Sequence, residues 1–294
     1  MPSRLAGDTY VERGSPSTVI YVQGQTAFLI DPGQGEDRPE RLRKAIRALG
    51  ADHVVVLLTH YHSDHVDAVE GLSPVEVVAS ERDAPMVRDP ELRVLSTFNY
   101  PLPPTDPSLM YRAGPVRVTH ELHDEEQHYG PIEVLRLPGH TEGHLAYATP
   151  DGVLHAGDSL FGDRVLQKYG VPYHKYPCDS MESLGRLSSA ISRYDHVVPG
   201  HGPIVRGHEA GALIDLNLSA LRSLVERVEE ALRSPSDVRE IVQYVARAHP
   251  DASWTPDNLM LLEASVKGVI RCLRAKGELA EEVSDGVLRW RLRA

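Results

Sequence analysis

The stretch THYHSDH, residues 59–65, places three histidines and one aspartate within seven positions. It directly follows HVVVLL, residues 53–58, whose apolar and β-branched side chains are typical of a strand buried on both faces. His60 and His62 are two positions apart, so on an extended chain their side chains project to the same side and can share a metal ion. We therefore interpret this stretch as the end of a strand that begins a metal site.

Later segments deliver similar side chains. Asp64 and His65 lie beyond a turn and can serve a second ion. The segments LPGHTEGH, HAGD and VPGHG then deliver His140, Asp158 and His201, each beside a glycine at the end of a strand-like run. Imidazole and carboxylate ligands without thiolate suit Zn²⁺, Fe or Mn. Five histidines and two aspartates suffice for two adjacent ions that share one carboxylate, an arrangement suited to hydrolysis.

The order of the other segments predicts a layered α/β or α+β domain with a helical unit after it. Up to about residue 207, β-rich runs alternate with helical patterns. Three amphipathic helices are expected next, followed by a hairpin that turns at Asp285-Gly286. Helices followed by a β-ribbon resemble a winged-helix unit. We therefore predict a domain over residues 1–207 and a helical, winged-helix-like domain over residues 208–294.

Composition narrows the classes of partner. The chain has 294 residues, with 31 Lys and Arg against 42 Asp and Glu, for a net charge of −11. This balance disfavours a broad grip on nucleic acid or an anionic membrane, since both require a basic face. The N-terminal residues include no apolar signal segment, and no apolar run has the length of a membrane span, so we expect a cytoplasmic protein. Cys178 and Cys272 suggest neither a disulfide framework nor a thiolate zinc site, and Cys178 is most simply a small buried residue.

The motifs THYHSDH, PGHTEGH, AGDSLF and PGHG, in this order, resemble those of the metallo-β-lactamase superfamily. The resemblance covers about residues 15–205. It implies a four-layer αββα sandwich with the site at one edge of two mixed sheets. The chain lacks the Cys ligand of the antibiotic-hydrolysing members, which disfavours a β-lactam substrate. It is closer to the glyoxalase II, lactonase and RNA-processing branches, and its helical tail resembles that of lactamase-beta-2-like proteins.

The resemblance also implies a division of the metal ligands. One ion would be held by His60, His62 and His140, the other by Asp64, His65 and His201, and Asp158 would bridge them. A metal-bridging hydroxide, oriented by Asp64 as the catalytic residue, would then attack the substrate. We expect two divalent ions, with Zn preferred and Mn or Fe as alternatives. The substrate expected is a small ester, thioester or lactone.

Other functions stay open at this point. One is a metal-dependent endoribonuclease or phosphodiesterase acting on single-stranded RNA, another a mononuclear iron persulfide dioxygenase. A third is a non-catalytic DNA-binding regulator, which the basic C-terminal residues support only weakly. For those residues a solvated face, a dimer contact or a pocket lid is the preferred interpretation, and a homodimer is left open.

Further residues are expected around the ligands. Asp31 in LIDPG would accept a proton from a ligand imidazole and fix its tautomer. His144 and His155 are expected in supporting rather than ligating positions. The aromatic and polar segment after Asp158 is assigned to substrate contact or to loop packing with equal weight. Its candidate substrate-binding residues are Tyr169, Tyr173, His174 and Tyr176.

Overall fold

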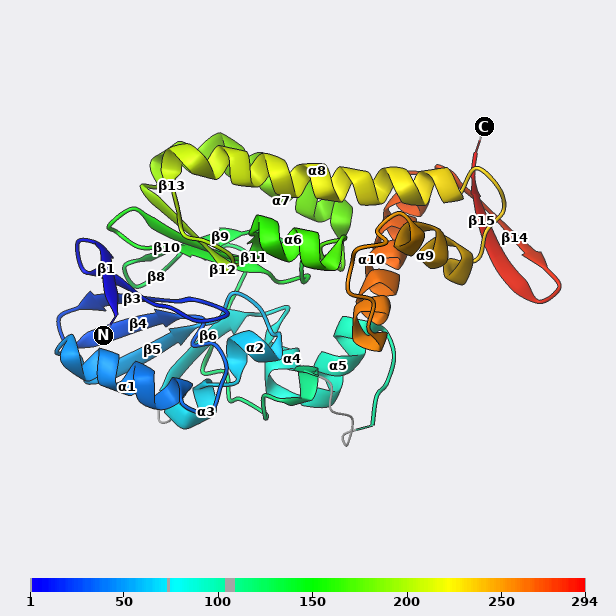
Figure 1. Ribbon diagram of the computed structural model, residues 1–294. Coiled ribbons are helices and arrows are strands. Elements are labelled where there is room, and N and C mark those ends of the chain that lie inside the picture. Colours follow the sequence, from blue (N-terminus) through cyan, green and yellow to red (C-terminus); the bar gives the residue numbers. More distant parts are fainter. Residues whose placement is uncertain (1, 73–74, 104–108, 294) are drawn as a thin grey trace.

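Two β-sheets packed face to face form the centre of the protein, with helices on both outer faces (Figure 1). The computed structural model describes residues 2–72, 75–103 and 109–293. The strands of the first sheet, in spatial order, are β1 (Ser3–Ala6), β2 (Thr9–Glu12), β3 (Thr18–Gln23), β4 (Thr26–Ile30), β5 (His53–Leu57), β6 (Glu76–Ser80) and β7 (His120–Leu122). Those of the second are β13 (Val205–Arg206), β12 (His196–His201), β11 (Val153–Phe161), β10 (Leu145–Ala148), β9 (Ile132–Arg136) and β8 (His128–Tyr129). This arrangement confirms the predicted layered α/β sandwich.

Strand β5 shows why the HVVVLL run is apolar throughout. Its Val55 and Leu57 side chains pack between the two sheets. Val56, which points the other way, packs against the helices on the outer face of the first sheet. Because both faces of the strand are buried, no polar alternation is needed. Strands β4, β5 and β6 run parallel, so the carboxyl ends of β4 and β5 lie at one edge of the sheet.

Helices cover the outer face of each sheet. On the side of the first sheet lie α1 (Arg38–Ala48), α2 (Ser63–Val66), α3 (Val69–Leu72), α4 (Ala84–Arg88), α5 (Pro90–Phe98) and the short 3-10 helix η1 (Leu109–Tyr111). On the side of the second sheet lie α6 (Asp163–Tyr169), α7 (Pro177–Ala190), η2 (Ile191–Arg193) and α8 (Gly207–Ala231). No helix of the described residues is both long and apolar enough to cross a membrane.

The C-terminal part contains the expected three helices and hairpin. After α8 come α9 (Val238–Arg247), α10 (Pro256–Ala275), β14 (Leu279–Ser284) and β15 (Val287–Leu292). The first half of α8 packs on the second sheet, whereas its second half packs with α9 and α10 in a separate core. This long helix therefore carries the chain from the sandwich into the helical unit (Figure 1). The boundary at residue 207 and the winged-helix comparison stay predictions.

One expectation about the cysteines is wrong. Cys178 at the start of α7 and Cys272 near the end of α10 form a disulfide across 94 positions of sequence. Cys178 is also only partly buried. The sequence contains no motif that pairs these cysteines, because it is the packing of α10 against the start of α7 that brings them together.

Candidate metal centre

All seven predicted ligands meet at one edge of the two sheets. Three overlapping groups each have their ligand atoms within 4.8 Å of one another: His60, His62 and His140; His60, His65 and Asp158; Asp64, His65 and His201. The first sheet supplies its members from the end of β5 and from α2, whereas the second supplies His140 from the β9–β10 loop and His201 from the end of β12. Asp158 lies within β11 rather than at its end, beside a register shift at Gly157.

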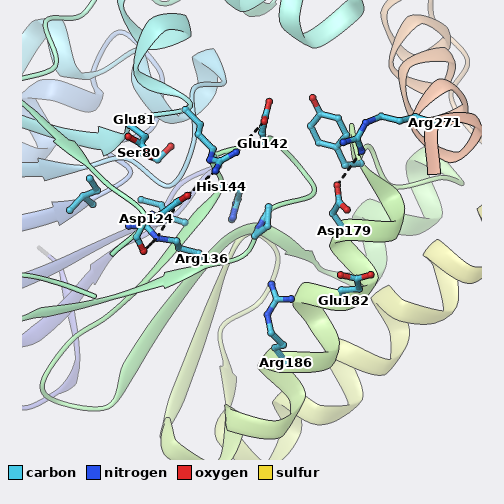
Figure 2. A pocket seen from close by; sticks show the side chains of 16 residues that line it. Ser80, Glu81, Asp124, Arg136, Glu142, His144, Asp179, Glu182, Arg186 and Arg271 are labelled. Carbon is cyan, nitrogen blue, oxygen red and sulfur yellow. Dashed lines mark hydrogen bonds and ion pairs between the residues drawn. The ribbon is translucent and has the colours of Figure 1, made fainter. Parts of the chain in front are cut away.

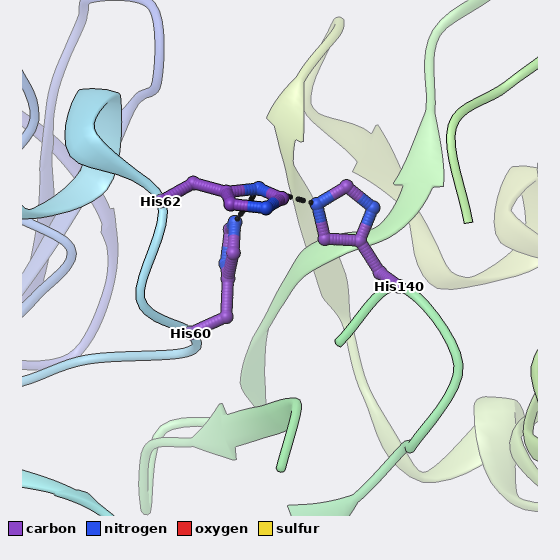
Figure 3. Close-up of side chains that lie close together, drawn as sticks. All are labelled: His60, His62 and His140. Carbon is purple, nitrogen blue, oxygen red and sulfur yellow. Dashed lines mark hydrogen bonds between the residues drawn. The ribbon is translucent and has the colours of Figure 1, made fainter. Parts of the chain in front are cut away.

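The three rings of the first group converge on a shared point (Figure 3). Nδ1 of His62 lies 3.0 Å from Nε2 of His60 and 2.9 Å from Nε2 of His140. Nδ1 of His140 donates to the carbonyl oxygen of Tyr173 at 2.8 Å, so its Nε2 carries a lone pair. Nδ1 of His60 contacts Oγ1 of Thr59, and that hydroxyl donates to Asp31. The Nε2 atom of His60 is therefore also a lone-pair donor.

The lone pairs of His60 and His140 both face Nδ1 of His62, which carries at most one hydrogen, so without a cation the two contacts cannot both be satisfied as full hydrogen bonds. Burial lowers the pKa of His60 and of His62 well below the ordinary histidine value, which keeps both rings neutral. Nε2 of His65 and Oδ1 of Asp158 are also buried without a hydrogen-bond partner among the described residues. A divalent metal satisfies such donors, so the residues present fit the group that the motifs imply.

The second group is richer in carboxylate. The Nε2 atom of His201 lies 2.9 Å from Oδ2 of Asp64 and 3.6 Å from Oδ2 of Asp158. Nε2 of His65 lies 3.4 Å from Oδ1 of Asp158. Asp158 also lies 3.6 Å from Nε2 of His140 in the first group. Its two oxygens thus face both groups, as a bridging carboxylate requires.

Charge explains the protonation of the second group. Burial alone lowers the pKa of His65, but the carboxylates of Asp158, Asp31 and Asp64 together raise it well above its usual range. Burial likewise raises the pKa of Asp158, but the neighbouring His201 and His65 hold it well below that of an ordinary carboxyl group. The carboxylate is therefore ionised, as a metal ligand must be.

Of the three supporting residues expected from the sequence, Asp31 and His144 contact ligand residues directly, whereas His155 lies behind them, with Nδ1 3.9 Å from Oδ2 of Asp31. Asp31 accepts from Nδ1 of His65 at 2.7 Å, and also from the backbone and hydroxyl of Thr59. His144 accepts a hydrogen bond from the backbone of Asp158 through Nε2, at 3.1 Å. His155 donates to the carbonyl of Ser17 and accepts from Gly157.

Two contributing residues have no signal in the sequence motifs. Oγ of Ser15 lies 2.9 Å from Nδ1 of His201, although the two residues are 186 positions apart. Asp83 accepts from the hydroxyl of Thr141 at 2.6 Å and from the backbone of Gly143 at 2.9 Å. It therefore supports the loop that carries His140. Burial raises the pKa of Asp83 to about 7. Asp83 reaches this loop only because the chain turns after β6.

A cavity of about 480 Å³ opens onto the metal centre. Ligand side chains at its base include Asp64, His140 and Asp158. Of the four predicted substrate-binding residues, Tyr169 and Tyr173 line this cavity. His174 is fully buried behind it, where its ring contacts those of His140 and Phe161 and its Nδ1 shares a hydrogen bond with Ser180.

Tyr176 lines a different cavity of about 370 Å³, which is rich in charged side chains (Figure 2). Arg82 there contacts both Asp124 and Glu142, and Arg271 contacts Asp179. These pairs neutralise Arg82 and Arg271, whereas Arg186 in the same lining contacts only the hydroxyl of Ser183 among the described residues.

The comparisons with known proteins agree with this geometry. A model described as "Metallo-beta-lactamase superfamily" matches residues 11–238. A hydroxyacylglutathione hydrolase from Halorhodospira halophila is 31% identical over 142 residues, which make up 47% of this chain and 43% of that relative. The chain thus matches less than half of that relative's length. A beta-lactamase-like protein 2 homolog from Drosophila melanogaster is 25% identical over 249 residues, covering 81% of this chain and 76% of the relative.

Solved structures extend the likeness in fold to nearly the whole chain. A metallo-beta-lactamase family protein from Thermus thermophilus superimposes with a TM-score of 0.70. The superposition covers 97% of this chain and 99% of that one at 21% identity, a level that shows shared fold alone. Because the family model matches far more than half of the residues and its motifs coincide with the clustered side chains, the chain belongs to the metallo-beta-lactamase superfamily.

Proposed function

We propose that the chain is a hydrolase that uses two divalent metal ions, preferentially Zn²⁺, to cleave a small ester, thioester or lactone. The observation that carries the proposal is the placement of Asp158 between two groups of imidazole ligands at the base of a cavity. The relatives named hydroxyacylglutathione hydrolase support the same reaction class.

The residues of the chain have different roles in the proposed reaction. Bound divalent ions supply an activated water and neutralise the negative charge that develops in the reaction. His60, His62 and His140 would hold one ion, Asp64, His65 and His201 the other, and Asp158 both. Asp64 lines the cavity and, as an ionised carboxylate, can also orient the attacking water. Asp31 holds the ring of His65 in one tautomer, so its Nε2 atom faces the centre.

The test begins with the full chain purified without chelators, whose metal content is measured and whose esterase, thioesterase and lactonase activities are assayed. We expect two metal ions per chain and at least one of the three activities. Asp158→Ala is expected to lose metal and to reduce the activity at least about a hundredfold, because it removes the residue shared by both ions. His128→Asn is the matched control, since His128 is exposed and lies outside the site.

The remaining alternatives give different results in the same assays. Cleavage of single-stranded RNA without any ester or thioester hydrolysis would support the phosphodiesterase. One Fe per chain with oxygen consumption on a persulfide would support the dioxygenase. If Asp158→Ala leaves an observed hydrolysis unchanged, the proposed site is wrong.

A further inference from the structure

The lining of the cavity above the metal centre combines apolar side chains with two cationic ones. The apolar part comes largely from the C-terminal unit, through Trp254, Leu261 and Leu262, together with Val165 and Val171. The one polar atom of the Trp254 ring already donates to the carbonyl of His249 at 3.1 Å. Trp254 can therefore offer its ring to a ligand only as apolar surface.

The cationic part comes from a single helix, α6. Arg164 and Lys168 are four residues apart on α6 and both line the cavity. Lys168 contacts the hydroxyl of Tyr169, and neither cation has a carboxylate within ion-pair distance among the residues that the structure describes. Apart from the ligands Asp64 and Asp158, the described lining carries no acidic side chain.

These two cations differ from the molecule as a whole in the sign of their charge. The chain carries a net charge of −11, and in the second cavity Arg82 and Arg271 are paired with carboxylates. An anion approaching the protein is therefore repelled overall and attracted locally at the face formed by Arg164 and Lys168. Since both side chains are exposed, water screens them, and their effect on binding is expected to be moderate.

On the basis of the proposed hydrolase function, we propose that the substrate is a thioester or ester of a particular polarity. Its acyl chain is apolar and lies against Trp254 and the α10 side chains, whereas the leaving part carries a negative charge that contacts Arg164 and Lys168. In hydrolysis the oxygen of water bonds to the acyl carbon and the carbon–sulfur or carbon–oxygen bond breaks. The leaving thiol or alcohol takes up a proton, and nothing is oxidised or reduced.

The experiment uses the full chain with its metal and four thioesters. Octanoyl and 2-hydroxypropanoyl groups are each joined to 3-mercaptopropionate, which is anionic, and to N-acetylcysteamine, which is neutral. We expect kcat/KM for octanoyl to exceed that for 2-hydroxypropanoyl by more than about tenfold, since several methylene groups are buried. The double variant Arg164→Gln/Lys168→Gln should lower kcat/KM about fivefold for the anionic thioesters, mainly through KM, and leave the neutral ones unchanged.

A binding measurement separates this inference from the proposed function. The chain has two tryptophans, so in Trp290→Phe protein the fluorescence of Trp254 reports the cavity alone. We expect the non-hydrolysable S-octyl thioether of 3-mercaptopropionate to quench it and the double variant to bind about fivefold more weakly. Arg239→Gln, on the exposed face of α9, is the matched control and should change neither measurement.

The outcomes are distinguishable. Binding of the thioether that depends on Arg164 and Lys168, without hydrolysis of any thioester, retains the ligand class and overturns the hydrolase function. Hydrolysis of all four thioesters within about twofold of one another retains the function and overturns the ligand class. An equal effect of the double variant on neutral and anionic thioesters also overturns it, since a charge contact acts on the anion alone.

Discussion

Nδ1 of His65 donates a 2.7 Å hydrogen bond to Oδ2 of Asp31, and neither side chain has any exposed surface. The acceptor belongs to the end of β4 and the donor to α2, so the bond joins two neighbouring segments at the sheet edge. The same carboxylate also holds Thr59, whose hydroxyl contacts His60. One buried aspartate therefore orients a histidine in each of the two ligand groups.

Asp31→Asn is expected to lower metal affinity about 10- to 100-fold while leaving the fold intact. The amide retains the size of the carboxylate and tolerates the positive φ of 51° at this position. It cannot accept all three hydrogen bonds with equal strength, so the ring of His65 is held less firmly. Competition against a chromophoric chelator measures the affinity. Asp52→Asn, an exposed change, serves as the control, and equal affinities in both variants would contradict the role assigned to Asp31.

Gly200→Ala should abolish metal binding for a purely steric reason. A Cβ atom at this position would lie 2.2 Å from Oδ1 of Asp158 and 2.9 Å from Cε1 of His65. The backbone at Gly200 does not require glycine, so the contact alone produces the effect. Metal content of the purified variant is the measurement.

The matched control is Gly185→Ala in α7, where a Cβ atom meets nothing within 4 Å. Alanine there should retain the metal and stabilise the helix by roughly 0.5–1 kcal/mol. Full metal content in Gly200→Ala would show that Asp158 can shift without losing its ligand position.

The raised pKa of Asp83 predicts how the stability of the fold depends on pH. Because burial raises its pKa to about 7, the folded chain binds a proton that the unfolded chain releases near pH 4. This contribution to stability is present below about pH 4 and is lost as the pH rises through about 7. Asp83→Asn cannot titrate, so its stability relative to the parent should rise across this window. Urea unfolding of the chelator-treated proteins at several pH values tests this. If the difference in the free energy of unfolding between Asp83→Asn and the parent stays constant with pH, the pKa of Asp83 is not raised in the folded chain.

Removing the disulfide should destabilise the chain without altering the metal ligands. The Cys178–Cys272 bond closes a loop of 94 positions, and loops of this length correspond to about 4.7 kcal/mol of chain entropy in the unfolded state. We expect Cys178→Ser/Cys272→Ser to show a lower midpoint in urea. Treatment of the parent with a thiol reductant should reproduce the effect. If reductant lowers the midpoint of the double variant as well, the effect has another cause.

Sequence reasoning succeeds here where the signal is local. The apolar run before Thr59 predicts β5 because a strand buried on both faces leaves a continuous pattern, and the ligand motifs lie in short segments. It fails where packing creates the contact. Ser15 reaches His201 only after the sheets assemble, and the two cysteines meet only after α10 docks. Likewise the segment after Asp158 contains the helix α6, although its glycines and aromatic residues resemble a loop.

Helix α10 approaches the backbone that follows Tyr173 very closely. A Cβ atom on Gly268 would lie 2.2 Å from the carbonyl oxygen of Lys175, and Ser265 accepts a hydrogen bond from the backbone of His174. The carbonyl of Tyr173 in turn holds the ring of His140. Exchanging α10 for the equivalent helix of a relative would therefore change the side chains that line the cavity. It would also change the backbone that positions the metal ligand His140. Substrate preference and metal affinity are consequently expected to diverge together when such proteins evolve.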